Sequence, residues 1–510
     1  MTFLENLKKE TTVSKTENGA VKYTSSLDNN LDFYAQAGAM RGRLDDVGSL
    51  FSLAYSENKN TALRNLLYLR DVRSGLGERE AFRRAFFNLM DNDPEVAKEL
   101  VKYVPEFGRW DDVVEIYWYA KQTMNVLVFR EAFGIISIQM RSDIDNALDD
   151  KPISLLAKWL PSPSTTNKRR KKIANSLASD MTVEVKVLRQ ALSILRKYIG
   201  IVETKLTDRE YSEIDFEKIP SKALFKYRQA FDRNMQEEYG AFINKVNSGE
   251  IKMNASNVLP YEIVRAYAEK NDYVKTFYWA NNITDTVDHV LEATWKSLDD
   301  TIGEKPLNAI VVADTSASMI GNPWYVAESL AIYCAERLNG AFKNHFITFS
   351  KNPKLIQIPN NGTLLSKIKE YHKHSIVSNT NIEATFRLIL DTAVTYDVKQ
   401  KDLPEKIIII SDMEFDFMSV NNNKTIFENM KGEFEYFGYK IPEVIFWNVD
   451  SRSENLQGRK DERGVAMVSG LTPNIFKAVL NGDITNPVKM MNQTLYSERY
   501  DVIEEVLKNV

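Results

Sequence analysis

The chain has 510 residues, which exceeds the usual size of a single hydrophobic core, so we expect two or more domains. Its 66 basic and 70 acidic side chains nearly balance, so any surface that attracts nucleic acid must be local. A single cysteine, Cys334, excludes an intramolecular disulfide framework and a multi-thiolate zinc site, and it favours a reducing, cytoplasmic environment. We also expect no membrane segment, because the start lacks a signal-peptide core and no apolar run approaches ~18 residues.

The N-terminal half carries the periodicity of amphipathic helices. From about residue 30 to residue 300, apolar residues recur with a 3.6-residue period and few strand patterns interrupt them. One such face comprises Ala81, Phe82, Ala85, Phe86 and Leu89, and another comprises Leu188, Leu192, Leu195, Ile199 and Val202. We therefore predict that residues 1–300 form an all-helical module of antiparallel helices, arranged as a bundle or a solenoid.

An arginine-rich corner follows one of these helical patterns. It reads Tyr68-Leu69-Arg70-Asp71-Val72-Arg73-Ser74-Gly75-Leu76-Gly77-Glu78-Arg79, and Arg83 and Arg84 follow in the next helix. The two glycines allow a tight turn that exposes the backbone, and arginines around such a turn can bind phosphates through two parallel hydrogen bonds. Alternatively, the arginines pair with nearby carboxylates in a structural corner. We favour the structural role for Arg70 and phosphate binding for Arg83 and Arg84.

A second corner, Phe107-Gly108-Arg109-Trp110-Asp111-Asp112, combines aromatic and charged side chains. Aspartate is a favoured residue at the start of a helix, because its carboxylate accepts hydrogen bonds from free backbone amides. We expect the aspartate pair to cap the helix that continues through Val113.

A run of cations begins after Asn167. Charge runs usually form a solvated face, but this run stands at a predicted helix start, where it opposes the helix dipole. The phosphates of RNA would offset that repulsion, so both interpretations stay open. The candidate RNA contacts of the whole helical module are Arg73, Arg79, Arg83, Arg84, Lys168, Arg169, Arg170, Lys171 and Lys172.

The C-terminal half alternates short β-branched segments with helical patterns. Strands are predicted at Leu307–Ala313, His345–Phe349, Ile407–Ile410, Val444–Val449 and Val465–Val468. This alternation is typical of βαβ units that form a parallel sheet, with the ligand site at the carboxyl edge of the strands. We predict an α/β domain at residues 307–485, a hinge before it at residues 301–306, and a C-terminal helical segment at residues 486–510.

Oxygen-bearing side chains follow two of these strands. The first strand ends in Asp314-Thr315-Ser316-Ala317-Ser318, and the strand Lys406–Ile410 ends in Ser411-Asp412. Between them, Ser378-Asn379-Thr380-Asn381 precedes another helical pattern. Such side chains can converge on Mg²⁺, which takes about six oxygen ligands at roughly 2.0–2.1 Å. A polar turn is the alternative, since Asp and Ser are common turn residues.

This order of loops resembles the metal-ion-dependent adhesion site of a von Willebrand factor A (vWA) domain. The resemblance implies a doubly wound, Rossmann-like vWA fold and one Mg²⁺ or Mn²⁺ ion, held by Asp314, Ser316, Ser318, Thr380 and Asp412. The third loop departs from the vWA pattern, because Met413 stands where a glycine commonly follows the aspartate. Its further carboxylates, Glu414 and Asp416, can add a ligand, occupy the open coordination position or repel an acidic partner.

Five segments together resemble a wider family. They are the arginine-rich corner, Phe107–Asp112, Lys158-Trp159-Leu160-Pro161, the Asp314 loop and Ser411–Asp416. The family comprises uncharacterised phage and plant proteins in which a TROVE-like helical module precedes a vWA domain, and these resemble the RNA-binding Ro autoantigen distantly. The resemblance implies a HEAT-like ring of helices closed by the vWA domain, with RNA at a basic surface.

The sequence contains no nucleophile–base pair of a recognised kind. It has four histidines, none in a catalytic or metal-binding spacing, and no phosphate-binding loop motif, so we expect no enzymatic activity. The leading hypothesis is a cytoplasmic, monomeric ribonucleoprotein component that binds single-stranded or small structured RNA. The alternatives are a module whose metal site recruits a carboxylate of a partner protein, and a phage assembly or structural protein.

Overall fold

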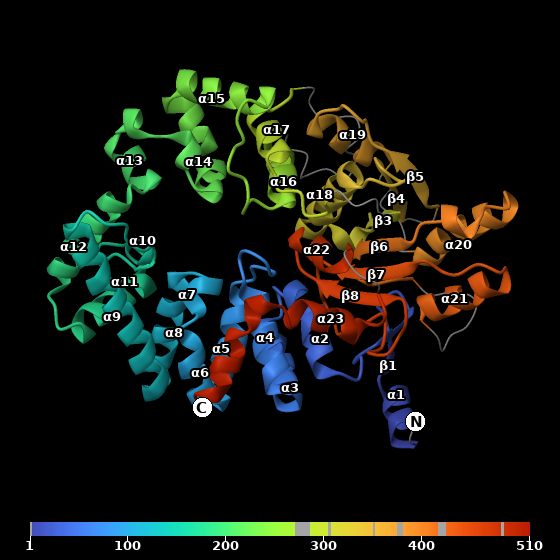
Figure 1. The fold of residues 1–510 in the computed structure, drawn as a ribbon, viewed down its shortest axis with the longest axis horizontal. Helices are drawn as coiled ribbons and strands as arrows, with labels where there is room; N and C mark the ends of the chain where they lie inside the picture. The colour runs from blue at the N-terminus through green and yellow to red at the C-terminus, as the bar shows by residue number, and fades with distance from the viewer. Residues whose placement is uncertain are drawn as a thin grey trace.

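The computed structural model describes residues 3–270, 286–303, 308–349, 352–374, 381–416, 425–480 and 484–510. An N-terminal helical region is followed by a mixed β-sheet domain, which is the predicted fold class (Figure 1). The helices follow an arc, and the sheet domain joins the two ends of this arc into a ring, since α2 packs on β8 and α16 packs on α18. No helix in the described ranges is long and apolar enough to cross a membrane.

The helical region opens with α1 and a β-hairpin and continues through α17. Its elements are α1 (Phe3–Thr11), β1 (Val13–Lys15), β2 (Val21–Tyr23), α2 (Asn29–Gln36), α3 (Leu44–Glu57), α4 (Lys59–Arg70), α5 (Glu80–Asn92), α6 (Pro94–Val101), α7 (Val104–Phe107), α8 (Trp110–Gln122), α9 (Val126–Leu148), α10 (Leu156–Trp159), α11 (Lys168–Asp180), α12 (Val185–Ile199), α13 (Val202–Asp208), α14 (Ser221–Asn234), α15 (Gln236–Ser248), α16 (Pro260–Lys270) and α17 (His289–Lys296). Local signals set several boundaries. Asn58 caps α4 by accepting a hydrogen bond from the Thr61 amide at 3.1 Å, and Gly200 ends α12 in the left-handed conformation.

Two hydrophobic cores hold these helices. The larger one runs from the first helices through α12 and is continuous with the core of the sheet domain. The smaller one belongs mainly to α13, α14 and α15, where Phe216, Phe231, Tyr239 and Phe242 pack ring against ring. The arc therefore contains a segment around α14 whose packing is separate from that of its neighbours.

The sheet domain has six strands in the order β5-β4-β3-β6-β7-β8 in the described part of the chain. They are β3 (Ala309–Asp314), β4 (His345–Phe349), β5 (Lys354–Gln357), β6 (Lys406–Ser411), β7 (Glu443–Asn448) and β8 (Val465–Ser469). The five predicted strands are all present, although Leu307 lies outside the described residues. Strand β5 was not predicted, because Ile356 is its sole buried residue and an exposed edge strand lacks the apolar run that marks the others. Strand β5 is antiparallel to β4, and the other neighbouring strands are parallel.

Helices cover the sheet on both faces, as in a doubly wound domain (Figure 1). They are α18 (Asn322–Arg337), α19 (Leu364–His374), α20 (Ile382–Thr395), α21 (Ile426–Tyr436) and α22 (Asn474–Leu480). Strand β3 lies between β4 and β6, so the strand order reverses beside it. Because β3 and β6 are parallel and Ala313 pairs with Ile410, the residues that follow both strands meet at one edge of the sheet. In open α/β sheets this reversal point is where ligands bind.

One joint between the helical arc and the sheet domain is a buried carboxylate. Glu292 of α17 accepts hydrogen bonds from the backbone amides of Leu364 at 2.7 Å and Leu365 at 3.2 Å, the first residues of α19. The hydroxyl of Tyr267 on α16 donates to the same carboxylate at 2.7 Å. Glu292 therefore caps a helix of the sheet domain and holds two helices of the arc against it.

The last residues of the chain hold the other side of the ring. Helices α23 (Pro487–Leu495) and α24 (Val502–Lys508) return to pack against α4 (Figure 1). The buried carboxylate of Asp71 accepts hydrogen bonds from Arg499 Nε at 2.7 Å, Arg499 Nη2 at 3.0 Å and the Tyr500 hydroxyl at 3.2 Å. The C-terminal segment therefore fixes the arginine-rich corner at the end of α4.

We predict that Arg499→Ala lowers the free energy of unfolding by about 3 kcal/mol, because it leaves the fully buried Asp71 carboxylate without its cation. Urea denaturation followed by circular dichroism measures this loss. Lys508→Ala removes an exposed cation from the same segment and serves as the control, with an expected change below about 0.5 kcal/mol. Equal stability of the two variants would show that the Asp71 contact does not hold the segment.

Candidate functional site

The loop after β3 gathers oxygen atoms around a buried carboxylate. Asp314 is the last residue of β3 and is fully buried. Its Oδ1 accepts a hydrogen bond from the Ser316 amide at 2.8 Å, and its Oδ2 accepts one from the Ser411 hydroxyl of β6 at 2.5 Å. The hydroxyls of Ser316 and Ser318 lie 2.9 Å apart. The carboxylate of β3 and both serine hydroxyls therefore face one edge of the sheet.

Asp412 adds a second carboxylate from the end of β6. It is buried, its Oδ1 accepts a hydrogen bond from the Glu414 amide at 3.2 Å, and it interacts with the Ser318 side chain. Asp314, Ser316, Ser318 and Asp412 are thus brought together. Thr380, the fifth predicted ligand, lies outside the described residues.

The electrostatics of this group suit a cation. Burial, together with the neighbouring Asp412 carboxylate, raises the pKa of Asp314 to about 7. Burial also raises the pKa of Asp412, against the effects of the Ser318 hydroxyl, the Glu414 amide and the Arg452 guanidinium. Two carboxylates buried side by side disfavour each other's ionised form, and a divalent ion would offset that repulsion.

The possible metal ligands at this edge are hard oxygen donors, and together they carry little negative charge. No group of three or more His, Cys, Asp or Glu side chains in the described ranges is placed to hold a metal. A metal at this edge would depend on two carboxylates, serine hydroxyls and water, which is the kind of ligand set that Mg²⁺ accepts. The residues that are present therefore fit the cation that the vWA resemblance implies.

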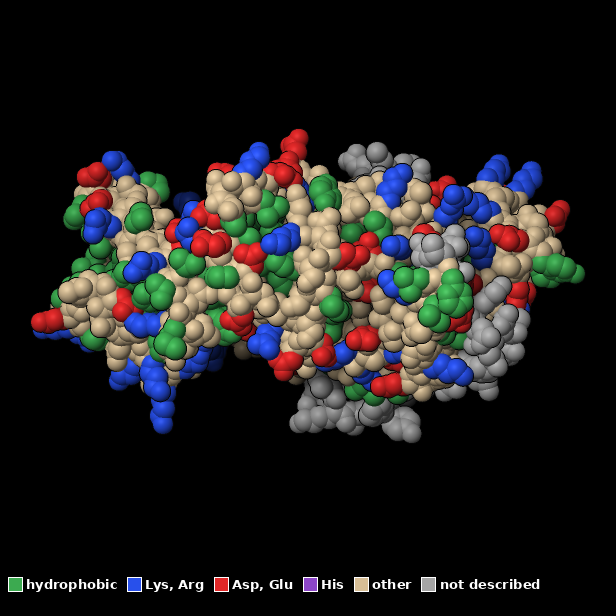
Figure 2. Space-filling model, turned by 90° about the horizontal axis from the view of Figure 1, so that it is seen from below, with side chains coloured by type: hydrophobic (Ala, Val, Ile, Leu, Met, Phe, Trp, Pro, Cys, Tyr) green, Lys and Arg blue, Asp and Glu red, His purple; other side chains and the backbone are tan. Residues whose placement is uncertain are grey.

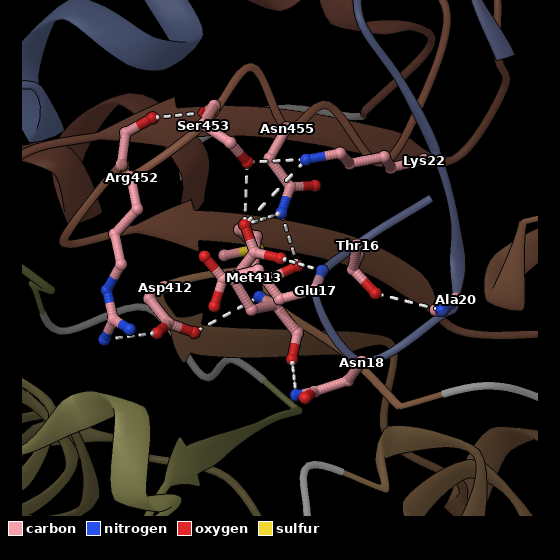
Figure 3. Close-up of polar contacts among 12 residues, drawn as sticks. Thr16, Glu17, Asn18, Ala20, Lys22, Asp412, Met413, Arg452, Ser453 and Asn455 are labelled. Atoms are coloured by element: carbon pink, nitrogen blue, oxygen red, sulfur yellow. Dashed lines mark hydrogen bonds and ion pairs between the residues drawn. The ribbon is translucent and has the colours of Figure 1, made fainter. Parts of the chain in front are cut away.

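Glu414 was expected to act at the metal or on an acidic partner, but its carboxylate binds groups of this chain. Its buried carboxylate accepts hydrogen bonds from the Glu17 amide at 2.8 Å, the Ser453 hydroxyl at 2.8 Å and the Asn455 amide group at 3.1 Å, and Lys22 lies 3.9 Å away (Figure 3). These contacts fix the N-terminal β-hairpin against the third loop of the sheet domain. Glu414 therefore joins the hairpin to the loop and is not free to act as a metal ligand.

Sequence reasoning missed Arg452, which lies in the loop after β7. Its Nη2 donates a hydrogen bond to Asp412 Oδ2 at 3.1 Å (Figure 3). The same nitrogen donates to the backbone carbonyl of Ser318. The loop after β7 is at the same carboxyl edge as the loops after β3 and β6. Its arginine could have been found by asking which cations follow the remaining parallel strands.

The glycine turn of the arginine-rich corner packs against other parts of the chain. Leu76 is buried between Gly38 and Gly470, where an added Cβ would lie 2.8 Å and 3.3 Å from its methyl groups. Both glycines are needed for this close approach, and Gly470 also adopts a positive φ of 125°. The corner therefore packs on the sheet domain through Leu76 and does not present its turn as an open phosphate cradle.

Arg83 was expected to contact phosphate, but in the structure its guanidinium pairs with carboxylates of the same chain. Its guanidinium donates to Asp112 Oδ1 at 2.8 Å and to Asp111 Oδ2 at 3.0 Å, and Arg70 donates to Asp112 Oδ2 at 2.8 Å. Asp112 also accepts the Arg109 amide at 3.0 Å and so caps α8, as the sequence indicated. Arg70 and Arg83 are buried, and both have a structural role as counter-ions of Asp112.

The other arginines of this corner are more accessible. Arg79 is exposed and pairs with Glu80 at 2.9 Å, while Arg84 pairs with the exposed Asp45 at 2.8 Å. Arg73 is exposed, and its guanidinium makes no ion pair with a residue of the described ranges. Of the candidate arginines in this corner, Arg73 is therefore the one with the most freedom to meet an anion.

The cation run at the start of α11 divides into two groups. Arg169 forms a two-point ion pair with Glu115 of α8, with 2.8 Å between Nη1 and Oε1, and Arg170 Nη2 donates to the Trp159 carbonyl at 3.1 Å. These two arginines fasten α11 to its neighbours. Lys168, Lys171 and Lys172 are exposed and form no ion pair within the described part of the chain.

Helix α11 lies at the end of the molecule formed by α9 to α12, on the left in Figure 1. Figure 2 shows Lys and Arg side chains gathered along the lower edge of the same end. Asn167 caps α11 by accepting a hydrogen bond from the Arg170 amide at 3.0 Å. The cap satisfies a backbone group at the helix start, but it supplies no negative charge to balance the lysines.

The fold defines a protein in which an arc of helices is closed into a ring by a doubly wound α/β domain. The family model described as "Domain of unknown function (DUF2828)" matches residues 16–130 and 131–306, together more than half of the chain, so the chain belongs to this family. The model described as "Domain of unknown function (DUF7788)" matches residues 308–506.

Two individual proteins are similar to the chain. The Uncharacterized protein L728 of Acanthamoeba polyphaga mimivirus is 27% identical over 514 residues, which cover 95% of this chain and 87% of that protein. The crystal structure of the Ro (RSR) protein of Deinococcus radiodurans matches with a TM-score of 0.43 and 12% identity, over 86% of this chain and 91% of that one.

We predict that Asp112→Ala lowers the free energy of unfolding by roughly 3–5 kcal/mol, because it leaves two buried guanidinium groups without their shared counter-ion. Urea denaturation measures the loss. Glu95→Ala, which removes an exposed carboxylate from α6, is the control and should change stability by less than about 0.5 kcal/mol. If Asp112→Ala is as stable as the control, Arg83 is free to serve another partner.

Proposed function

We propose that the protein is a non-enzymatic RNA-binding component of a ribonucleoprotein, with a divalent cation held at the carboxyl edge of its sheet. The observation that carries the RNA proposal is the group of three exposed lysines, Lys168, Lys171 and Lys172, on the first turns of α11. Their mutual repulsion and their opposition to the helix dipole make them a local attractor for phosphate in a chain whose net charge is −4.

The resemblance of the sequence motifs to the Ro-related family supports RNA as the polyanion. Arg73, on the accessible side of the arginine-rich corner, is a further candidate contact. Arg83 is left out of the proposed contact set, because its guanidinium already serves Asp111 and Asp112. We propose single-stranded or small structured RNA as the ligand class, since contacts to phosphate alone require no base sequence.

The proposed cation is Mg²⁺ or Mn²⁺, held by Asp314, Ser316, Ser318 and Asp412 with Thr380 as the fifth protein ligand. The raised pKa of Asp314 and the converging serine hydroxyls support this proposal. When bound, the ion would supply an open coordination position for an oxygen of a partner. We propose binding without catalysis, and metal-dependent hydrolysis of RNA or nucleoside triphosphates by the purified protein would contradict it.

The RNA proposal is tested by neutralising the three lysines together. Lys168→Ala, Lys171→Ala and Lys172→Ala should weaken binding of a single-stranded RNA and flatten the slope of log affinity against log salt by about two, at roughly 0.7 per lost phosphate contact. Fluorescence anisotropy over a series of salt concentrations measures both quantities. The protein should stay folded, because exposed unpaired cations contribute little to stability.

The matched control removes three exposed lysines from the sheet domain, Lys399, Lys401 and Lys440, and changes the net charge equally. It should leave the salt slope near that of the wild type. If the α11 variant binds RNA with unchanged affinity and unchanged salt slope, the cation run is a solvated face and does not contact RNA. Absence of RNA binding by the wild type at low salt would leave the metal-dependent recruitment of a partner protein as the function to test.

The metal proposal is tested with Asp314→Asn, which removes the charge and keeps the size and hydrogen-bonding oxygen of the side chain. Mn²⁺ affinity, measured by titration calorimetry, should fall by at least about tenfold. Stability in chelator should not fall, because the wild-type carboxylate is buried beside a second carboxylate. Asp391→Asn, at an exposed position of α20, is the control, and equal Mn²⁺ binding by both variants would place the ion elsewhere.

A further inference from the structure

The guanidinium of Arg452 already neutralises one of the proposed metal ligands. Its Nη2 contacts Asp412 Oδ2 at 3.1 Å (Figure 3). It also contacts the carbonyl oxygen of Ser318, so it bridges the loops after β6 and β3. The Asp412 side chain is fully buried, whereas about a third of the Arg452 side chain is exposed. A partly exposed cation from a third loop therefore contacts one of the carboxylate oxygens at the sheet edge.

An arginine and a divalent ion cannot share this place without a cost in free energy. A carboxylate oxygen that accepts a guanidinium hydrogen bond has less electron density for a metal, and two cations on one carboxylate repel each other. We propose that Arg452 is an internal cation that competes with the divalent ion for Asp412. The inference rests on the proposed metal site, and it adds that binding of the ion displaces this side chain.

Arg452 has a second acidic partner within reach. Its Nε lies 3.7 Å from Asp450 Oδ2, on the same loop. Burial raises the pKa of Asp450, and the guanidinium groups of Arg452 and Arg41 oppose that rise. When the ion binds Asp412, the arginine can keep its ion pair with Asp450. Asp450 therefore remains as an acidic partner for the guanidinium when Asp412 binds the ion.

The loop that carries Arg452 is tied to the helical arc. The Ser451 amide donates to the Ala39 carbonyl at 3.0 Å, and the Asn455 amide donates to Gln36 Oε1 at 3.3 Å. The Ser453 hydroxyl donates a hydrogen bond to Glu414, which also contacts the N-terminal hairpin. Displacement of Arg452 therefore acts on a loop that contacts the place where α2 and the hairpin meet the sheet domain.

The test is a Mn²⁺ titration of the full chain, followed by calorimetry or by electron paramagnetic resonance of the free ion. Arg452→Ala and Arg452→Gln should each bind Mn²⁺ about tenfold more tightly than the wild type, since no guanidinium then competes for Asp412. Arg452→Lys retains a cation and should lie between them and the wild type. Arg463→Ala removes an exposed arginine from the same loop and should bind Mn²⁺ as the wild type does.

A second readout uses thermal unfolding. In chelator, Arg452→Gln should unfold at a lower temperature than the wild type, because Asp412 loses its cation, and added Mn²⁺ should raise its unfolding temperature by more than it raises that of the wild type. Equal Mn²⁺ affinity of the wild type and both neutral variants would overturn the competition and leave the metal site standing. Absence of Mn²⁺ binding in every protein would overturn the metal site itself.

Discussion

The ring depends on buried carboxylates that join segments far apart in the sequence. Asp71 fixes the C-terminal segment to the end of α4, and Glu292 fixes α17 to α19. Glu414 fixes the N-terminal hairpin to the third loop of the sheet domain. Each carboxylate accepts two or more hydrogen bonds from different partners, and a hydrogen-bonded charge of this kind has a strongly preferred position. Apolar packing alone is not directional, so these contacts select one way of closing the arc.

The fold class was predictable because it depends on local periodicity. The β-branched run of β3 and the apolar faces of α5 and α12 each carry their own signal within a few residues. The proximity of Asp314 and Asp412 was also predictable, since residues that follow neighbouring parallel strands lie at the same edge of the sheet. Strand β5 was missed because its one buried side chain gives no alternating pattern.

The roles of individual charged residues were harder to predict, because their partners are distant in the chain. Arg499 lies 428 positions from Asp71, and Glu414 lies 397 positions from Glu17. Arg83 and Lys172 look alike in the sequence as cations of helical segments, and burial alone separates a counter-ion of Asp112 from an exposed lysine. No local pattern shows which of these cations is buried. Leu76 differs, because the Gly-Leu-Gly turn in which it stands is visible in the sequence.

The two charged features of the molecule lie in different parts of the ring. The carboxylates are at the sheet edge, whereas the lysines of α11 are on the far side of the arc (Figure 1). At physiological ionic strength exposed charges act over about 8 Å, so one feature does not set the potential at the other. Communication between them would have to pass through packed elements. The continuous core from α2 to α12 provides such a route, and the loop of Arg452 contacts its first helix through Gln36. A change at the proposed metal site would therefore reach the helical arc through the packing at α2, and not through the electrostatic field.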